Sequence, residues 1–407
     1  MRKRRKIFMK QKEMRLSIAS LLLVLSGMLL TACQTNGQSG SNESDTAERD
    51  KQSVRNNDIT DMNEANYEHH DKDERDAMPL KEVTPDEWQV EVLAENLNIP
   101  WALNVHEDVI FMTDREGHII EIENGETTQS ELQTSTPVAH IGEGGLLGFV
   151  LAEDFFDTGE AYAYYTYQTD EGHFENRIVR VEQQHNNGWS ETEILLDNIP
   201  GAEIHNGGRL AVGPDGMLYA AIGDADIPDA AQDESNLAGT ILRMTPEGDI
   251  PEDNPIEGSY VYSYGHRNPQ GLAWRNNGEM YSSEHGAVGH DEINIIESGH
   301  NYGWPVIEGD ETEEGMEEPL IHSGEDTWAP SGVTFWEEQL LVTGLRGEAL
   351  YLFDEEGEEM IDIFSGEGRL RDVTYDGDAL YVITNNRDGR GQPKENDDRL
   401  LKLTLNQ

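Results

Sequence analysis

Cysteine is almost absent from this chain: Cys33 is the only one among 407 residues. The chain can therefore form no internal disulfide, and apart from Cys33 it has no thiol nucleophile. A disulfide-stabilised fold and cysteine-based catalysis are excluded. Stability has to come from packing and from any bound metal.

Basic residues are also scarce. The sequence holds 29 Lys and Arg against 81 Asp and Glu, which gives a formal net charge of −52. Because binding to nucleic acid requires a positive surface that faces the phosphates, this charge excludes nucleic acid as a partner. A strongly acidic surface instead favours solubility in a salty medium, where ions screen its self-repulsion.

The basic residues that do occur are concentrated at the front of the chain. Eight of them lie in the first fifteen residues, and a run of fifteen mostly apolar residues follows at 16–30. That run falls short of the ~20 residues that a membrane-spanning helix needs. A basic head and a short apolar middle are typical of a secretory signal. The segment Leu30-Thr31-Ala32-Cys33 resembles the lipobox of bacterial lipoproteins.

These features predict that 1–32 is a lipoprotein signal peptide and that Cys33 carries the lipid. The mature protein would be exported and anchored by this lipid to the outer face of the cell membrane, or to the periplasmic side of a membrane in a host with two. The alternative is an uncleaved membrane anchor with an incidental cysteine. Removal of the signal would leave 21 basic and 80 acidic residues, a net charge near −59.

Aromatic residues are nearly missing from the next segment, 33–87, where Tyr67 is the only one. Asn, Ser, Asp, Glu and Lys dominate this segment, and such a composition cannot bury enough apolar surface to offset the entropy of ordering. We therefore predict a disordered acidic and polar linker between the lipid and a folded domain at 88–407. His69-His70 is interpreted as a solvated pair within it.

A sustained helical period is lacking from the folded domain. Short β-rich runs alternate instead with turns such as Asp215-Gly216 and Asn277-Gly278, which are strong hairpin signals. The pattern recurs in six modules of about 40–60 residues. The modules begin at Trp101, Gly145, Gly208, Gly271, Gly332 and Leu370. This organisation predicts an all-β fold, a six-bladed β-propeller of four-stranded antiparallel blades.

Two motifs suggest cofactor or metal sites without the required spacing. The glycine-rich run 142–148 continues into an apolar strand, where a dinucleotide-binding loop needs a helix. Glu284-His285 and His290-Asp291-Glu292 contain zinc-ligand residue types, but no helical register places them on one face. Neither a nicotinamide cofactor nor a catalytic zinc ion is expected.

Five blocks are too specific for generic propeller strands. They are 205–210 (HNGGRL), 263–272 (SYGHRNPQGL), 283–286 with 291–294 (SEHG and DEIN), 301–305 (NYGWP) and 369–373 (RLRDV). Together they resemble the soluble glucose/aldose sugar dehydrogenase family that depends on pyrroloquinoline quinone (PQQ). The likeness spans roughly 99–403, essentially the whole folded domain.

The resemblance implies a catalytic and cofactor-binding set. His205 matches the general base. Arg267 and Asn268 match residues that hold the quinone, and Arg267 also lies near the reacting carbonyl. Three further cofactor contacts are implied at Arg346, Arg369 and Arg371, although Arg369 and Arg371 could instead offset local acids.

The resemblance also implies two calcium sites. Gly286 and Ala287 match backbone carbonyl ligands of a calcium ion that binds the cofactor. Glu292 and Tyr302 match a second, structural calcium site. Ala287 stands where a proline is common in the family, which preserves a carbonyl ligand but loosens the loop.

Two further departures concern the base. Glu143 stands near the base and cofactor, where the glucose-oxidising members carry a glutamine. The residue before His205 is Ile204 and not an acid, so any carboxylate that orients the base has to come from elsewhere. These departures put the identity of the sugar in doubt more than the type of reaction.

The residue types suit the implied chemistry. PQQ is a planar tricarboxylate, and arginine pairs with carboxylates through two parallel hydrogen bonds. Calcium prefers hard oxygen ligands, including backbone carbonyls. A neutral histidine can accept the hydroxyl proton while hydride leaves the same carbon.

The resulting expectation is an enzyme that oxidises an aldose sugar to a lactone with PQQ and calcium and passes electrons to an external acceptor. A homodimer is left open. One alternative is a non-catalytic extracellular propeller that binds a ligand or protein, because the fold alone does not imply catalysis. Another is a metal-dependent lactone hydrolase, which would need a carboxylate-lined central calcium that the sequence does not clearly supply.

The lipid-anchor hypothesis predicts the outcome of a single substitution. Cys33→Ala should release the protein into the medium or block its maturation, because the lipid supplies the membrane affinity. Membrane fractionation of the expressed full chain measures this. Unchanged recovery of the variant in the membrane fraction would contradict the hypothesis.

Overall fold

The computed structural model describes residues 79–184 and 188–405. Cys33, the predicted signal peptide and most of the predicted linker lie outside the described residues. The described part consists of strands β1 to β24 with four short helical segments, which are η1 (Leu80–Glu82), η2 (Pro85–Glu87), α2 (Phe155–Thr158) and η3 (Pro228–Gln232). Within these two ranges, no helix is long and apolar enough to cross a membrane. The predicted all-β class is confirmed.

Four of the sheets contain four antiparallel strands each. The first comprises β10 (Leu210–Val212), β11 (Leu218–Ile222), β12 (Thr240–Met244) and β13 (Val261–Tyr264). The second comprises β14 (Pro269–Trp274), β15 (Met280–Glu284), β16 (Glu292–Ile296) and β17 (Ile321–His322). The third comprises β18 (Pro330–Trp336), β19 (Gln339–Gly344), β20 (Ala349–Asp354) and β21 (Glu359–Ser365). The fourth comprises β22 (Leu370–Tyr375), β23 (Leu380–Thr384), β24 (Leu400–Leu405) and β1 (Trp88–Ala94).

A fifth sheet has eight strands in the order β2-β3-β4-β5-β9-β8-β7-β6. One half comprises β2 (Pro100–His106), β3 (Val109–Asp114), β4 (His118–Glu123) and β5 (Glu126–Gln133). The other half comprises β6 (Leu146–Leu151), β7 (Glu160–Gln168), β8 (Phe174–Gln183) and β9 (Trp189–Pro200). Each half is antiparallel, and the halves are joined where Leu132 and Gln133 of β5 pair in parallel with Trp189 and Ser190 of β9.

This joined sheet differs from the separate four-stranded blades that the sequence predicts. Both β5 and β9 are the outer strands of their antiparallel sets. An outer strand presents unpaired N–H and C=O groups, and two such edges pair when they meet. The short pairing is an edge contact of this kind.

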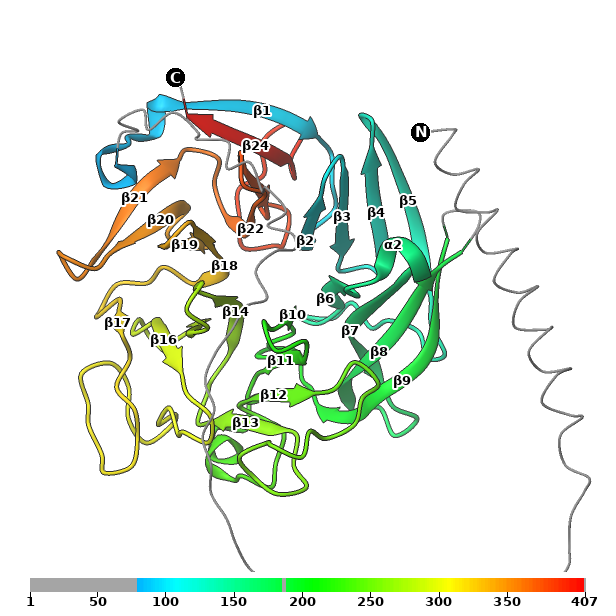
Figure 1. Cartoon of the computed structure of the whole chain (residues 1–407), viewed down its shortest axis with the longest axis vertical. Helices are drawn as coiled ribbons and strands as arrows, with labels where there is room; N and C mark the ends of the chain where they lie inside the picture. The colour runs from blue at the N-terminus through cyan, green and yellow to red at the C-terminus, as the bar shows by residue number, and fades with distance from the viewer. Residues whose placement is uncertain (1–78, 185–187, 406–407) are drawn as a thin grey trace, which may run out of the picture. The chain divides into compact units, whose positions relative to one another are not determined.

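The sheets radiate from a central axis, with β2, β6, β10, β14, β18 and β22 innermost (Figure 1). Each inner strand contacts the next, and β22 contacts β2, so the ring of sheets is closed. β1 precedes β2 in the chain but pairs with β24, from Trp88↔Leu405 to Ala94↔Leu400. The first and last described strands therefore share one sheet. This closed radial arrangement is that of a β-propeller.

Apolar side chains fill the spaces between neighbouring sheets. β7 is buried from Ala161 to Tyr167, because a sheet packed on both faces has no solvated side. The ring of Trp189 in β9 packs against Phe149 of β6 at 5.2 Å and against Phe155 of α2 at 5.9 Å between centroids. The core is thus distributed between the sheets, and residues around the axis are available for other roles.

The folded region begins earlier than predicted. Leu80 and Val83, which the sequence assigns to the linker, are 5% and 3% exposed and pack in one cluster with Trp88 and Leu350. Trp88 also donates a hydrogen bond from Nε1 to the Ile363 carbonyl at 2.7 Å. Leu80 and Val83 therefore belong to the folded region, although the sequence assigns them to the linker. Two apolar residues among polar neighbours gave too weak a signal to be recognised.

Candidate active site

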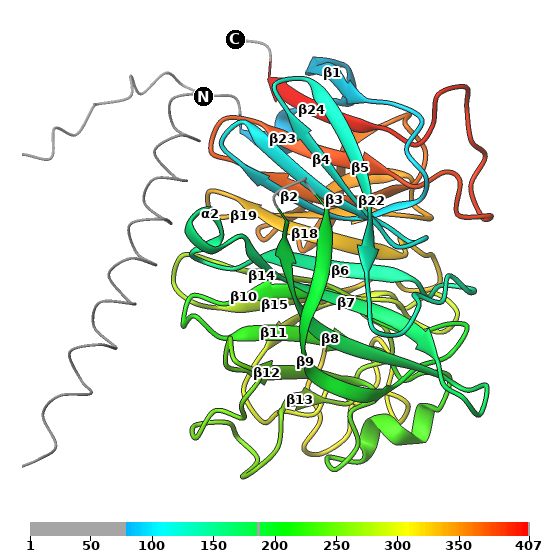
Figure 2. The same cartoon turned by 90° about the vertical axis from the view of Figure 1, so that its right-hand side faces the viewer.

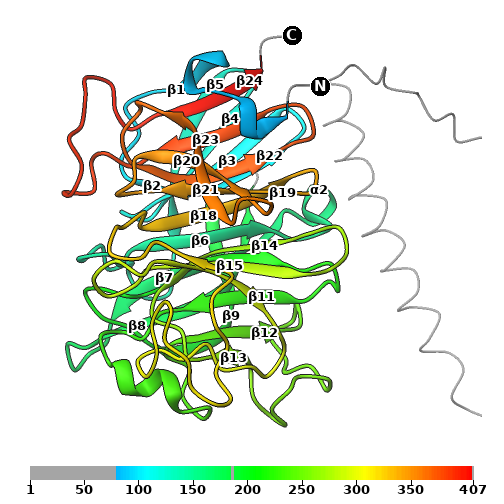
Figure 3. The ribbon, with the colours of Figure 1, turned by 90° about the vertical axis from the view of Figure 1, so that its left-hand side faces the viewer.

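The first strand of each sheet begins, and the second strand ends, at the same face of the ring, because the two are antiparallel neighbours. Loops before the first strands and after the second strands consequently converge at that face. Figures 2 and 3 show one of them, the red β23–β24 loop (residues 385–399), projecting beyond the strands. These converging loops line a cavity of about 690 Å³.

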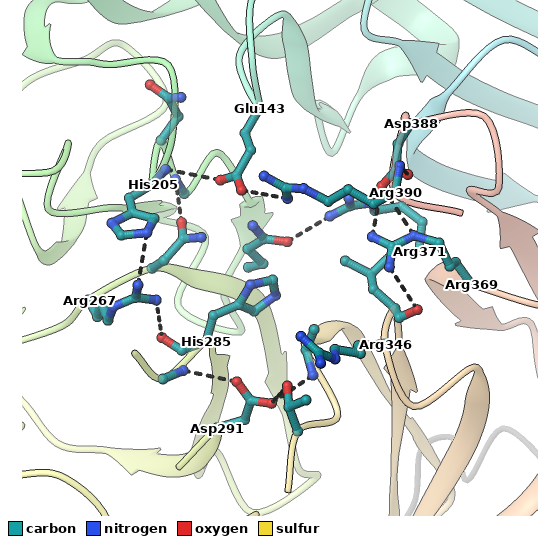
Figure 4. Close-up of a pocket in the computed structure, with 18 of the residues that line it drawn as sticks. Glu143, His205, Arg267, His285, Asp291, Arg346, Arg369, Arg371, Asp388 and Arg390 are labelled. Carbon is teal, nitrogen blue, oxygen red and sulfur yellow. Dashed lines mark hydrogen bonds and ion pairs between the residues drawn. The ribbon is translucent and has the colours of Figure 1, made fainter. Parts of the chain in front are cut away.

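The cavity collects most of the predicted site. Nine sequence-predicted residues line it, and Figure 4 labels six of them. The nine are Glu143, His205, Arg267, Asn268, Gly286, Ala287, Arg346, Arg369 and Arg371. The other two, Glu292 and Tyr302, lie outside this lining, as expected for a separate site.

The hydrogen bonds of His205 define which of its nitrogens carries the proton. Nδ1 lies 2.8 Å from Oδ1 of Asp224, and Nε2 lies 3.0 Å from Nη2 of Arg267. A guanidinium group can only donate, so Nε2 is the acceptor and Nδ1 bears the proton that Asp224 accepts. Asp224 is fully buried and also accepts a hydrogen bond from Trp304 Nε1 at 2.8 Å. The lone pair of a neutral imidazole is therefore held at Nε2, in contact with Arg267.

Sequence reasoning missed Asp224. The absence of an acid at Ile204 left the partner of His205 open, and the structure supplies it from the loop after β11. Positions shortly after the second strand of a sheet recur in the cavity lining, as Arg115, His285, Arg346 and Asp388. This recurrence is visible only once the strands are placed in the ring, so no local signal in the sequence indicated Asp224.

Arg267 is fixed from several directions. Its Nη1 donates to the His285 carbonyl at 3.1 Å, and its backbone N–H donates to the carboxylate of Glu284. The guanidinium carbon lies 5.3 Å from the centroid of the Trp304 ring, within cation–π range. Its Nε is buried and has no hydrogen-bond partner among the described residues.

Arg371 is a buried cation whose partners are neutral. Its guanidinium donates to Gln270 Oε1 at 2.6 Å, to Ser331 Oγ at 3.3 Å and to Asn385 Oδ1 at 3.2 Å. Within the described part of the chain, its Nε has no partner and no carboxylate lies at ion-pair distance. Burial lowers the pKa of Arg371 to about 9, and neighbouring arginines add to this effect. Such a group favours an anion in the cavity.

Arg369 differs from Arg371 in having an acidic partner. Its Nη2 and Nε donate to Oδ2 of Asp388 at 2.7 and 3.2 Å, and its Nη1 donates to the Leu345 carbonyl at 3.1 Å. The side chains of both Arg369 and Asp388 are almost fully buried. Arg369 thus has an acidic partner in this structure, whereas Arg371 has none among the described residues.

Asn268 and Arg346 also line the cavity. Asn268 is 1% exposed and accepts the Gly207 N–H on Oδ1 at 3.0 Å. Arg346 follows β19, and its backbone N–H donates to the Trp328 carbonyl at 3.0 Å.

The loop that carries Gly286 and Ala287 is organised by Asp291. Oδ1 of Asp291 accepts a hydrogen bond from the Gly286 N–H at 2.9 Å. Oδ2 accepts three hydrogen bonds at 2.6–2.7 Å, from the Thr327 hydroxyl and from the N–H groups of Trp328 and Ala329. A Cβ at Gly286 would lie 2.0 Å from the Gly289 carbonyl oxygen, so only glycine fits this turn. The predicted carbonyl ligands thus lie on a tightly constrained loop at the cavity.

His285 is a second histidine of the lining. Burial lowers its pKa to about 4, and the nearby arginines Arg371 and Arg267 act in the same direction. The imidazole is therefore neutral at physiological pH. Its Nε2 is buried and lacks a hydrogen-bond partner among the described residues. The sequence placed it in the 283–286 block and in a rejected zinc cluster, without a role in the site.

Glu143 is charged although it is largely buried. Burial by itself would raise its pKa, but the Arg390 guanidinium and the His205 N–H outweigh this and lower it to about 2. Oε1 of Glu143 lies 2.6 Å from Nη1 of Arg390, and Oε2 accepts the His205 N–H at 3.0 Å. The acid that replaces a glutamine is thus neutralised by an arginine.

Glu292 and Tyr302 belong to a cluster beside the cavity. Glu292 lies opposite Glu284 across the β15–β16 ladder. Burial, with the adjacent Glu284 and Glu308 carboxylates, raises the pKa of Glu292 to about 8. Tyr302 stacks on His266, whose Nδ1 lies 2.9 Å from Glu284 Oε2. The structure therefore links the two predicted residues through Glu284, which also holds Arg267.

The cluster is rich in buried oxygen atoms. Asn294 Oδ1 and Glu308 Oε1 are buried and lack hydrogen-bond partners among the described residues. Over the same residues, no three His, Cys, Asp or Glu side chains are grouped as a metal site. An ion here would consequently need amide and backbone oxygens as well as Glu292, which is a ligand set that calcium accepts.

Comparisons with known proteins agree with this geometry. The family model of glucose/sorbosone dehydrogenases matches residues 97–401. The aldose sugar dehydrogenase YliI of Escherichia coli K12 is 30% identical over 345 residues, covering 74% of this chain and 91% of the relative. Quinoprotein glucose dehydrogenase B of Acinetobacter calcoaceticus is 34% identical over 259 residues, covering 55% of this chain and 54% of the relative.

Solved structures give the same result for the fold. The PQQ-bound aldose sugar dehydrogenase of Streptomyces coelicolor is 38% identical and superposes with a TM-score of 0.72, covering 79% of this chain and 100% of that structure. The sequence resemblance is confirmed, and this chain belongs to the glucose/sorbosone dehydrogenase family.

Proposed function

We propose that this protein oxidises an aldose sugar at the anomeric carbon to a lactone, using PQQ held over calcium, and passes the electrons to an external acceptor. The observation that carries the proposal is the lining of one cavity. It combines a neutral histidine whose lone pair is held at Nε2 with buried cationic donors that lack anionic partners in the described chain. The histidine can accept the proton of an alcohol, and the cationic donors can bind an anionic quinone cofactor that accepts the hydride.

His205 is assigned as the general base. Asp224 keeps the proton on Nδ1, so Nε2 can take the proton from the anomeric hydroxyl. The hydroxyl oxygen loses this proton and the anomeric carbon loses a hydride, so the C–O single bond becomes the lactone carbonyl. Arg267 contacts Nε2 and can stabilise negative charge that develops beside it.

The cavity residues fit PQQ, which supplies a quinone that accepts the hydride when it is bound. Arg371 and Arg369 would pair with its carboxylates, and Arg267 with Asn268 would hold the quinone end. Three buried nitrogens in the lining lack partners among the described residues, namely Arg267 Nε, His285 Nε2 and Arg371 Nε. A ligand that formed a hydrogen bond to one of these nitrogens would offset the cost of burying it without a partner.

Calcium is proposed at both predicted positions. The carbonyls of Gly286 and Ala287 would hold the ion at the cofactor. Glu292, Tyr302 and the buried oxygens of Asn294 and Glu308 would hold the structural ion. Burial and the neighbouring carboxylates raise the pKa of Glu292, because the charged form has no cation beside it. A bound calcium ion would supply that cation and favour the charged carboxylate.

Two structural aspects belong to the same proposal. We infer six blades, because each half of the eight-stranded sheet has its own inner strand and six inner strands form the closed ring. We also propose that the domain works outside the cell, attached by lipid on Cys33 through the linker. The signal-like sequence at 1–33 supports this location.

The alternative functions are less well supported. A non-catalytic binding propeller does not require a histidine whose tautomer is defined by Asp224 and Arg267. A lactone hydrolase would need a carboxylate-lined central metal, and the described cavity residues contain no group of three metal-ligating side chains.

The base assignment predicts the behaviour of His205→Gln. This variant should bind PQQ and calcium almost normally yet lose turnover by roughly a hundredfold or more, because the proton acceptor is gone. Steady-state sugar oxidation with a dye acceptor measures it after reconstitution of the purified domain. His300→Gln, at a 39% exposed histidine paired with Glu317, is the matched control and should keep full activity. Wild-type turnover in His205→Gln would remove His205 from the mechanism.

The cofactor assignment predicts weaker PQQ binding in Arg371→Ala. The loss should be about 1.5–3 kcal/mol, or roughly 10- to 150-fold in Kd, the scale of a hydrogen bond to a charged group. Fluorescence titration of the apoprotein measures it. Arg369→Ala should lose a comparable amount, whereas Arg180→Ala on β8, outside the cavity, should lose nothing. Unchanged affinity in both cavity variants would show that these arginines do not bind the cofactor.

The calcium assignment predicts a loss of thermal stability on chelation. Removal of the ion should lower the melting temperature at fixed salt, because the neighbouring Glu284 and Glu292 are then left without a cation. Glu292→Gln should show a smaller shift than the wild type, because only the ion at Gly286 and Ala287 then remains to be removed. Glu297→Gln, an exposed acid at 66% next to the same strand, should respond like the wild type. No shift in wild-type protein shown to have lost its calcium would contradict the site.

A further inference from the structure

The backbone of His205 has an unfavourable conformation. Its φ is +56°, in the left-handed region that residues with a Cβ seldom adopt. Its carbonyl accepts the Ala225 N–H at 3.1 Å and lies against Gly223, where a Cβ would be 1.9 Å from the carbonyl oxygen. The conformation directs the imidazole to Asp224 and Arg267, so contacts that hold it also hold the base.

Glu143 provides one of these contacts. Its carboxylate accepts the His205 N–H at 3.0 Å, and its own N–H donates to the Glu203 carbonyl at 2.6 Å. The preceding Gly142 packs so closely that a Cβ there would lie 2.0 Å from the same carbonyl oxygen. The turn at 142–143 is thus pressed directly onto the segment that leads into His205.

Arg390 reaches Glu143 from the β23–β24 loop. Its Nη1 lies 2.6 Å from Glu143 Oε1, across the cavity lining (Figure 4). The backbone N–H of Arg390 donates to Oδ1 of Asp388 at 2.9 Å, and Oδ2 of Asp388 accepts from Arg369. One loop therefore contacts both the cofactor side and the base side of the cavity.

We propose that Glu143 and Arg390 are positioning residues for His205: Arg390 orients the Glu143 carboxylate, which in turn holds the left-handed backbone of the base. The inference rests on the proposed function for its kinetic consequences. Arg390 acts only through Glu143, and Asp388 ties this ion pair to Arg369.

The exposure of the two side chains determines how the ion pair works. The side chain of Arg390 is 56% exposed and that of Glu143 is 19% exposed. A pair this open to solvent contributes little to global stability and weakens as salt is added. Its effect is therefore expected in the orientation of His205 and not in the melting temperature.

A double-mutant cycle tests the proposal in the reconstituted enzyme. Glu143→Ala should lower kcat by about ten- to a hundredfold, the scale of a small misplacement of a reacting group. Glu143→Gln should restore part of that loss, because its amide oxygen can still accept the His205 N–H. Arg390→Gln should lower kcat by a few-fold in the wild type and by nothing in the Glu143→Gln background. The sugar KM should stay within about twofold throughout.

A second readout does not depend on activity. The apoprotein labelled with ¹⁵N-histidine has at most 13 histidine amide signals, and the His205 signal is the one that His205→Gln removes. It should shift in Glu143→Ala and Arg390→Gln. Lys394→Gln removes one charge from the same loop at a side chain that donates to the Gly366 carbonyl, and it should leave the signal unchanged.

The outcomes distinguish failure of the proposed function from failure of the positioning role. An inactive wild-type enzyme would reject the proposed function, while the amide signal would still report on positioning. An active wild type with an unmoved His205 amide and wild-type kcat in both variants would reject the positioning role. A raised KM in Arg390→Gln that persists in the Glu143→Gln background would make Arg390 a substrate contact and would also overturn it.

Discussion

The site depends on a closed ring of inner strands, whose last sheet is completed by the pairing of β1 with β24. The cavity lining comes from every sheet, from Trp101 in β2 to Arg390 in the β23–β24 loop. These lining residues meet only because six inner strands contact one another in a closed order, and the first and last strands complete one sheet. Burial of apolar side chains between the sheets supports this closure and leaves the axis for polar chemistry.

The electrostatics of the cavity are opposite to those of the chain. A protein with a formal charge of −52 gathers six arginines around one cavity. Some of them are balanced locally, Arg369 by Asp388 and Arg390 by Glu143. Arg371 has only neutral partners among the described residues, and its lowered pKa records the cost of that burial. A bound anion would offset this cost, so cofactor binding and local stability are coupled.

Local patterns in the sequence predicted more of the fold than of the contacts in the site. Hairpin turns at Gly216 and Gly278, with φ of +75° and +92°, depend on neighbouring residues and were predictable. The contact between His205 and Asp224, and the ion pair of Glu143 with Arg390, depend on ring closure and had no local signal. The edge pairing of β5 with β9 is likewise a product of how whole sheets meet.

The predicted site residues were found together for a different reason. Composition and spacing alone did not group Arg267, Arg346 and Arg371; the resemblance of whole sequence blocks to a known family did. The structure then explains the grouping, because Arg267 precedes β14, Arg346 follows β19 and Arg371 lies in β22, all at the same cavity. Asp224 escaped notice because no block surrounded it, whereas His285 lay in the 283–286 block but was considered only as a zinc ligand.

The most direct test of the account is a single turnover without any electron acceptor. The apoprotein is loaded with PQQ and calcium under anaerobic conditions, an aldose panel is added, and the cofactor absorbance is followed. We expect at least one aldose to reduce the bound cofactor completely, with one equivalent of lactone formed per cavity. Stoichiometric cofactor binding with a spectrum that no aldose changes would contradict the assignment of this cavity to sugar oxidation.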